Sequence, residues 1–370
     1  ANVMLAHRAG EILDLDLTPG DFTPLLPGGG LLTLLQRLPM PLTHLRYSLL
    51  LRACQDIAGG FDQVLGFYNE GNFGAPGIQY VHNPSAATRG TGGAARCYGK
   101  LGYVSALYHR LADRLCHLDA NSIHRNLTLV NSNYTRELVH SAHGIQSTLL
   151  YPPVSGPFYP SHWSGKRDAF AWIGRIHPYK QVEKAIRIVE LVRGRGFPVG
   201  LELFGVADDQ DYLRHLRVLV ASRGEWCRLH IGLSRKALFE QVGKLRYGLH
   251  TMTDEPFGMT VCEMMSSGCI TLVPDRAGPA EILQHHPDLC FSDPEDAVIK
   301  ICRLLNDEQR REAALGYIDM RREVFGGETF GAQLREIVAS SIESRLGPVN
   351  RVSRSLEPQG DRAWPGRPCV

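Results

Sequence analysis

Two carboxylates frame a potential anion site in the segment Asp254–Gly268, which reads DEPFGMTVCEMMSSG. Glu255 precedes a predicted helix, and Glu263 lies inside it, eight positions later. Residues 257–259 would open the helix with free backbone amides, which attract anions together with the helix dipole. Carboxylates on both sides suit a diphosphate with hydroxylated groups at both ends, as in a nucleotide-sugar. At about 1.5 Å of rise per residue, they would lie on the order of 10 Å apart.

Two cations follow the predicted strand Ala169–Ile173. Arg175 and Lys180 are five positions apart across the turn after that strand. Both can point into the space above the strand end, where they would neutralise a diphosphate and stabilise its departure as a leaving group. Taken alone, they could equally be solvated surface charges. The neighbouring segment 254–268 favours the shared site.

Polar residues also follow elements elsewhere in the chain. His82 ends the predicted strand Ile78–Val81 and could exchange a hydrogen bond with a hydroxyl across a cleft; a structural histidine is the alternative. Residues 278–281 offer further amides at a helix start, although a core-facing loop fits nearly as well. Two weaker patterns lack support from their surroundings: Gly28–Gly30 as a phosphate loop and the pair Asp14 and Asp16 as a metal site.

Alternating strands and helices position these residues. In the second half, strands are predicted at Ala169–Ile173, Gly200–Phe204, Arg228–Ile231, Tyr247–Thr251 and Cys269–Val273. Helices are predicted there at Gln181–Val192, Gln210–Ser222, Arg235–Leu245, Met259–Ser266, Pro294–Asn306 and Glu308–Val324. In the first half, strands are predicted at Gln63–Phe67, Ile78–Val81, Leu127–Val130 and Thr148–Tyr151, and helices at Leu31–Leu38, Leu42–Ala58, Leu101–Leu118 and Tyr134–His143. Such alternation predicts parallel sheets, with ligands at the carboxyl ends of the strands.

The 370 residues exceed what one core usually serves, about 250–300 residues, so we expect two domains. The first covers residues 1–151, and the proline-rich segment 152–165 is the predicted linker. The second domain covers 166–330. A C-terminal helix at 331–346 and a disordered tail at 347–370 complete the predicted organisation.

The overall composition and net charge of the chain exclude several classes of protein. A hydrophobic fraction of 44% and a net charge of +2 support neither a nucleic-acid binder nor a strongly acidic partner. No apolar run approaches the ~18 residues of a membrane span, and no secretory signal is visible. The nine cysteines contain no C-x-x-C pair, which indicates reduced thiols in a cytoplasmic protein. No His or Cys cluster has metal-ligand spacing, so we expect no metal.

Together these motifs resemble the retaining glycosyltransferases of family 4. That resemblance implies an α/β protein of GT-B architecture, with two Rossmann-like domains whose parallel sheets face a cleft. The matching segments cover most of residues 78–330 and read VHNPS, LVNSNYT, LLYPPV, WIGRIHPYK, LELFG, EPFGMTVCEMMSSG and AGPAEIL. They look most similar to the α-1,2-mannosyltransferases that extend lipid-linked oligosaccharides, and to bacterial relatives of these enzymes.

The resemblance implies a metal-independent hexosyltransferase that needs no cofactor and uses a GDP- or UDP-sugar as substrate. His82, Arg175, Lys180 and Glu255 would be catalytic. The donor would be bound by Gly174, Arg175, Lys180, Glu255, Phe257, Gly258, Met259, Thr260, Val261 and Glu263. Among these, Arg175 and Lys180 would hold the diphosphate, Glu255 the sugar hydroxyls and Glu263 the ribose.

Family members open with a strand and a glycine-rich loop, which this sequence lacks, so the first domain is predicted to be truncated. The acceptor would be a glycan or a lipid-linked hydroxyl compound. A lipid-linked acceptor would add a peripheral contact with the inner membrane face, for which the Arg-bearing face of residues 101–125 is the candidate. Two alternatives stay open: a sugar-nucleotide epimerase and a non-catalytic nucleotide-sugar binder on the same fold.

Overall fold

The computed structural model describes residues 43–84, 108, 111–112, 114 and 120–346. Several predictions lie outside these residues: the truncated N-terminal unit, Gly28–Gly30, Asp14 and Asp16, the helix at Leu31–Leu38 and the tail at 347–370. Most of the proposed lipid-facing segment, residues 101–125, lies outside them as well.

Over the residues that the structure describes, the first sheet has four strands in the order β1-β2-β3-β4, all parallel. The strands are β1 (Leu65–Gly66), β2 (Ile78–Val81), β3 (Leu127–Val130) and β4 (Thr148–Leu149), with the helices α3 (Thr43–Ile57) and α7 (Asn133–His143). All four residues of β2 are buried. A strand buried on both faces is typical of a parallel sheet covered by helices.

The second sheet has six parallel strands in the order β10-β9-β8-β5-β6-β7. The strands are β5 (Arg167–Arg175), β6 (Gly200–Val206), β7 (Cys227–Ile231), β8 (Leu245–Leu249), β9 (Ile270–Pro274) and β10 (Cys290–Phe291). The helices are α8 (Val182–Gly194), α9 (Gln210–Ala221), α10 (Arg235–Val242), α11 (Met259–Ser266), α12 (Ala277–Ile282), α13 (Pro294–Asn306) and α14 (Glu308–Arg322). The predicted parallel sheet is confirmed, and β10 is a strand that the sequence pattern did not indicate.

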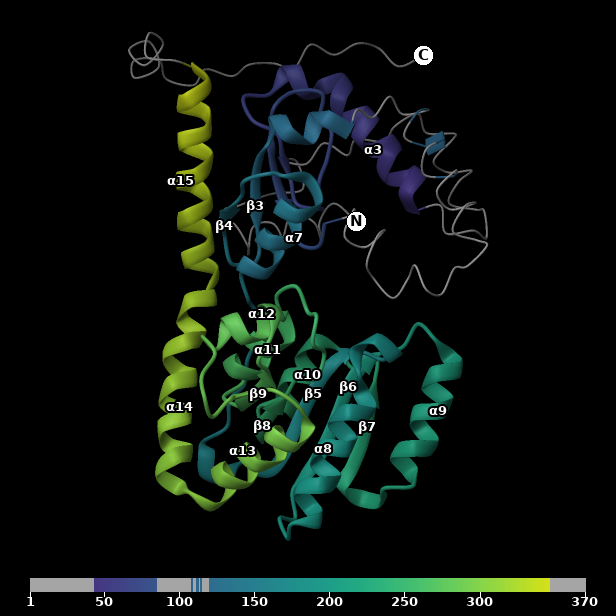
Figure 1. Cartoon of the computed structure of the whole chain (residues 1–370), viewed down its shortest axis with the longest axis vertical. Helices are drawn as coiled ribbons and strands as arrows, with labels where there is room; N and C mark the ends of the chain where they lie inside the picture. Colours follow the sequence, from purple (N-terminus) through teal and green to yellow (C-terminus); the bar gives the residue numbers. More distant parts are fainter. Residues whose placement is uncertain (1–42, 85–107, 109–110, 113, 115–119, 347–370) are drawn as a thin grey trace.

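The last helix, α15 (Gly327–Leu346), returns to the first sheet. Phe330 and Leu334 belong to the same buried cluster as Ile78 and Tyr80 of β2. Figure 1 shows α14 and α15 running along one side of the molecule, from the lobe of the second sheet to that of the first. The helix begins at Gly327 rather than at residue 331, and it completes the core of a domain from which it is distant in sequence.

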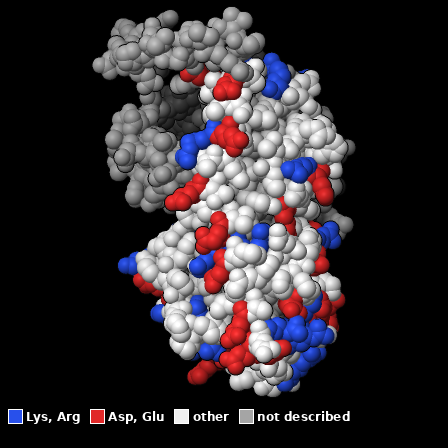
Figure 2. Space-filling view, turned by 90° about the vertical axis from the view of Figure 1, so that its left-hand side faces the viewer, with Lys and Arg blue, Asp and Glu red and all other residues white. Residues whose placement is uncertain are grey.

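Acidic and basic side chains are interspersed on the face shown in Figure 2. Lysines and arginines lie beside aspartates and glutamates across the described residues of the second lobe, and neither sign forms a large continuous patch there. This mixture agrees with the net charge of +2.

Candidate functional site

A cavity of about 790 Å³ lies where the carboxyl ends of the two sheets face each other. On one side it is lined by His82 and Asn83 after β2 and by Asn131 after β3. The other side is formed by the ends of β5 and β6, the segment after β8 and the start of α11. Its volume falls in the range of about 300–1,000 Å³ that is usual for ligand sites.

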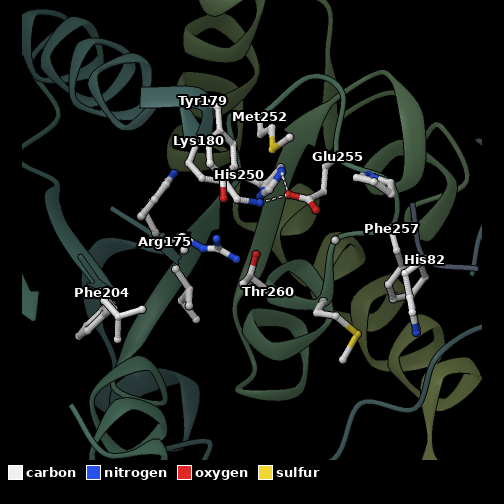
Figure 3. Close-up of a pocket in the computed structure, with 18 of the residues that line it drawn as sticks. His82, Arg175, Tyr179, Lys180, Phe204, His250, Met252, Glu255, Phe257 and Thr260 are labelled. Atoms are coloured by element: carbon white, nitrogen blue, oxygen red, sulfur yellow. Dashed lines mark hydrogen bonds and ion pairs between the residues drawn. The ribbon is translucent and has the colours of Figure 1, made fainter. Parts of the chain in front are cut away.

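An ion pair lies at the centre of this cavity (Figure 3). Lys180 Nζ donates to Glu255 Oε2 at 2.5 Å, and the two side chains are only 19% and 17% exposed. Arg175 also lines the cavity, and its Nε lies 4.0 Å from Asp208 at the exposed rim. The two predicted cations therefore do share the space above the strand end, but one of them is already paired with the predicted sugar-binding carboxylate.

The start of α11 presents backbone amides to the same cavity. Its N-cap is Gly258, with φ 111°, and no side chain caps the helix. That φ lies in the left-handed region, which favours glycine. Gly278 lets α12 pack against this loop, since a Cβ there would lie 2.4 Å from Phe257 O, and its N–H donates to Glu255 O at 3.1 Å. The predicted anion site thus has a fixed backbone.

The other residues predicted to bind the donor form two groups, those that line the cavity and those that do not. Gly174, Phe257, Gly258, Met259 and Thr260 line the cavity.

Val261 and Glu263 do not line it in this structure. Val261 is fully buried, and the 9%-exposed Glu263 side chain bonds Arg235 Nη1 at 3.0 Å. Burial raises the pKa of Glu263, and the charge of Arg235 opposes this rise. The ribose contact of Glu263 stays a prediction, since the carboxylate would have to share its bond with Arg235.

His82 faces the cavity from the first sheet. Its ring nitrogen Nε2 lies 3.2 Å from Phe67 O, and its ring packs against Tyr80 at a centroid distance of 4.5 Å. Burial lowers the pKa of His82, partly offset by the bond to the Phe67 carbonyl. A depressed pKa keeps the imidazole neutral near pH 7, so this wall of the cavity carries a neutral hydrogen-bonding group.

His250 is a cavity residue that the sequence pattern did not single out. The predicted strand extended to Thr251, whereas β8 ends at Leu249. His250 therefore lies directly after the end of a strand, as His82 does after β2. Its Nε2 lies 4.0 Å from Glu255 Oε2, and the cavity is lined by His250 (Figure 3).

Hydrogen bonds join the two sides of the cavity directly. Ser132 Oγ, at the N-cap of α7, donates to Pro256 O at 2.5 Å. Glu281 accepts from the backbone N–H and side-chain amide of Asn133 at 2.8 and 2.7 Å, and from Tyr151 Oη at 2.8 Å. The sequence predicts backbone amides as the functional groups of the segment 278–281, whereas these contacts are made by the side chain of Glu281.

This arrangement of two parallel α/β sheets with a cavity at their facing carboxyl ends is the GT-B fold. Residues 160–317, less than half of the chain, match the family model described as "Glycosyl transferases group 1". The second half of the chain therefore carries a glycosyltransferase group 1 domain.

One curated relative is 26% identical over 186 residues. It is the GDP-Man:Man(3)GlcNAc(2)-PP-Dol alpha-1,2-mannosyltransferase of Dictyostelium discoideum. The alignment covers 45% of this chain and 37% of that protein, so this chain spans well under half of the relative's length.

Solved structures support the fold over most of the chain. Sucrose-phosphate synthase from Thermosynechococcus elongatus superposes with a TM-score of 0.59 at 15% identity, covering 79% of this chain and 77% of that one. HepE from Anabaena in complex with UDP gives 0.56 at 16% identity, over 78% and 76% of the two chains. Trehalose 6-phosphate synthase from Burkholderia multivorans gives 0.56 at 14% identity, over 80% and 77%.

No helix among the residues that the structure describes is both long and apolar enough to cross a membrane. No group of three or more His, Cys, Asp or Glu side chains within them is arranged to hold a metal ion.

Proposed function

We propose that this protein is a retaining glycosyltransferase that moves a hexose from a nucleotide-sugar to a hydroxyl acceptor. The observation that carries the proposal is the cluster of Arg175, Lys180 and Glu255 at the uncapped start of α11, inside a cavity whose opposite wall is neutral over the residues that the structure describes. Cations and free amides suit a diphosphate, and a carboxylate suits sugar hydroxyls. Their close juxtaposition suits a ligand that has both groups.

In this proposal Arg175, Lys180 and the amides at the start of α11 bind the diphosphate and stabilise it as it leaves. The acceptor oxygen forms a bond to the anomeric carbon on the same face from which the phosphate departs. The bond between that carbon and the phosphate oxygen breaks, and the departing phosphate takes the proton of the acceptor hydroxyl. With this positive charge in place, the reaction needs no metal ion.

Glu255 binds the hydroxyls of the transferred sugar in this arrangement, and its bond to Lys180 orients the carboxylate. His82 lies on the opposite wall, where the acceptor enters. Glu263 is proposed to reach the ribose once its bond to Arg235 is shared with the ligand.

We infer mannose or glucose as the transferred sugar. The Dictyostelium relative is named for GDP-mannose and a dolichol-linked acceptor, which favours GDP-mannose and a lipid-linked glycan. The Anabaena neighbour was solved with UDP, which makes UDP-glucose the second donor to test. A lipid-linked acceptor would bring the protein to the cytoplasmic face of a membrane as a peripheral protein, and sedimentation with anionic liposomes tests that contact.

A panel of nucleotide-sugars tests the proposal. Incubation with GDP-mannose and UDP-glucose and a hydroxyl acceptor should give transfer, with the α-configuration of the donor retained in the product by NMR. An isomerised donor would indicate an epimerase instead, and binding without turnover would indicate a nucleotide-sugar binder. A thermal-shift panel selects the base first, because a ligand of the native state raises the melting temperature.

A further inference from the structure

An imidazole nitrogen without a partner lies in the wall of the cavity. His250 is 4% exposed, and its backbone N–H donates to Leu272 O at 2.9 Å, which fixes it to the neighbouring strand β9. Its Nε2 is buried and makes no hydrogen bond, although the residue lines the cavity. A buried polar atom without a partner is destabilising, so such an atom calls for an explanation.

The surroundings of His250 define what this nitrogen can do. A hydrogen bond with the backbone of Met252 raises the pKa of the ring, as a carbonyl that accepts from a ring N–H does. Since Nε2 has no partner, Nδ1 must carry that proton, and Nε2 is a bare acceptor. Burial lowers the pKa of His250 to about 4; Lys180 and Lys184 also oppose protonation, and Glu255 favours it. The ring is therefore neutral near pH 7.

Two acceptors thus stand side by side in the cavity. His250 Nε2 and Glu255 Oε2 are 4.0 Å apart, too far for a direct hydrogen bond. Because both are acceptors, a phosphate oxygen placed against them would be repelled, whereas hydroxyl groups can donate to them. Lys180 already donates to Oε2 of the Glu255 carboxylate, which leaves its Oε1 to accept from a hydroxyl.

We propose that His250 Nε2 accepts a hydrogen bond from a hydroxyl of the transferred sugar, next to the hydroxyl held by Glu255. The site then selects a sugar with two adjacent free hydroxyls and discriminates against one that is deoxygenated or substituted at either position. This inference rests on the proposed function, because it assigns the sugar end of the same donor.

Binding measurements separate the sugar from the nucleotide. The matched variants are His250→Phe, which keeps a planar ring and removes the acceptor, and His250→Gln, which restores an acceptor. Calorimetry with GDP, GDP-mannose, UDP and UDP-glucose gives their Kd values without turnover. In His250→Phe the nucleotide-sugar should bind at least about fivefold more weakly, while the Kd of the matching diphosphate changes by less than about twofold. His250→Gln should recover part of the loss.

Monodeoxy analogues of the donor sugar locate the contact. In the wild-type protein, two analogues lacking adjacent hydroxyls should bind at least about fivefold more weakly than the parent, and the others should bind like it. Of those two, the analogue that lacks the hydroxyl bound by His250 should bind the wild-type protein and His250→Phe with equal affinity. The analogue series on the wild-type protein tests the inference even where His250→Phe does not fold, which circular dichroism and a melting curve reveal.

The results that would contradict this inference differ from those that would contradict the proposed function. If the wild-type protein binds the nucleotide-sugars and His250→Phe binds them equally well, or if this variant loses affinity equally for the diphosphate, His250 has no contact with the sugar. The inference is also overturned if removing a hydroxyl weakens binding only at positions that are not adjacent, or at no position. A wild-type protein that binds no nucleotide-sugar overturns the proposed function, and this inference with it.

Discussion

The two walls of the cavity differ in charge. The wall from the second sheet carries Arg175 and the pair Lys180–Glu255. The wall from the first sheet presents His82, whose pKa is lowered by burial, and the neutral amide of Asn131. Among the described residues, charge is thus concentrated on the wall that would bind a diphosphate, and the opposite wall offers neutral polar groups to the acceptor hydroxyl. The difference suits a protein in which the second domain binds the diphosphate and the first domain binds the acceptor.

The domains also differ in how their cores are built. The second sheet has six strands and a large buried cluster drawn from its own helices. In its described part the first sheet has four short strands, and Phe330 and Leu334 of α15 belong to its buried cluster. The wall that would bind the donor is therefore supported by one continuous domain, whereas the acceptor wall depends on a helix that crosses from the other.

The largest effect is expected from Glu255→Ala. Transfer should fall by about 10²–10³ in kcat/KM, because the sugar hydroxyls lose their charged acceptor. The Kd of the nucleoside diphosphate should be kept or improved, since Lys180 becomes free to bind phosphate. Steady-state kinetics and calorimetry measure the two quantities. Glu240→Ala is the matched control, because Glu240 is a partly exposed carboxylate on α10 that pairs with Lys236. Equal loss of diphosphate affinity and transfer would contradict the assigned role.

Arg175→Ala should have the next largest effect and a different profile. Diphosphate affinity should weaken by about tenfold, and kcat/KM by at least as much, since a cation is lost from both the bound and the leaving phosphate. Thermal stability should not change, because Arg175 is 55% exposed and lies 4.0 Å from Asp208. The control is Arg187→Ala on α8, whose exposed guanidinium pairs with Glu190. Unchanged diphosphate binding in Arg175→Ala would remove the residue from the site.

Glu281→Ala tests the bonds that hold the two walls together. The change removes the acceptor for Asn133 and Tyr151, so the melting temperature should drop by a few degrees, consistent with about 1–2 kcal/mol. The KM of the acceptor should rise more than the Kd of the diphosphate. The change lets the two walls separate, whereas the charged wall from the second sheet keeps its own contacts. Glu281→Gln keeps an acceptor oxygen and should be milder. A loss confined to diphosphate binding would show that Glu281 does not join the walls.

The smallest effect is expected on the neutral wall. His82→Phe keeps the ring packing against Tyr80 and removes the hydrogen-bonding nitrogens. The KM of the acceptor should rise by about threefold to tenfold, and the Kd of the diphosphate should stay the same. Initial rates at saturating donor measure the first, and calorimetry the second. If diphosphate binding weakened as well, the assignment of the diphosphate to one wall and the acceptor to the other would be wrong.

Local patterns predicted much of the second domain. The helices Met259–Ser266 and Pro294–Asn306 have the predicted bounds, and Ser234 caps α10 locally by accepting from the N–H of Ala237. These features depend on neighbours within a few positions, such as apolar spacing and capping side chains. The same spacing predicted that Arg175, Lys180 and Glu255 would lie at carboxyl ends of parallel strands, and all three line the cavity.

The sequence by itself thus determined most of the elements, the parallel sheets and the residues placed at the strand ends, because each of these follows from short-range pattern. Only the tertiary structure decided the pairings: Lys180 with Glu255, Glu263 with Arg235, Glu281 with Asn133, and α15 with the first sheet. The two members of each pairing are far apart in the chain, and which partner a buried charge or apolar face meets depends on how the elements pack. The unpaired nitrogen of His250 is known for the same reason, since only the packed site shows which polar atoms have no partner.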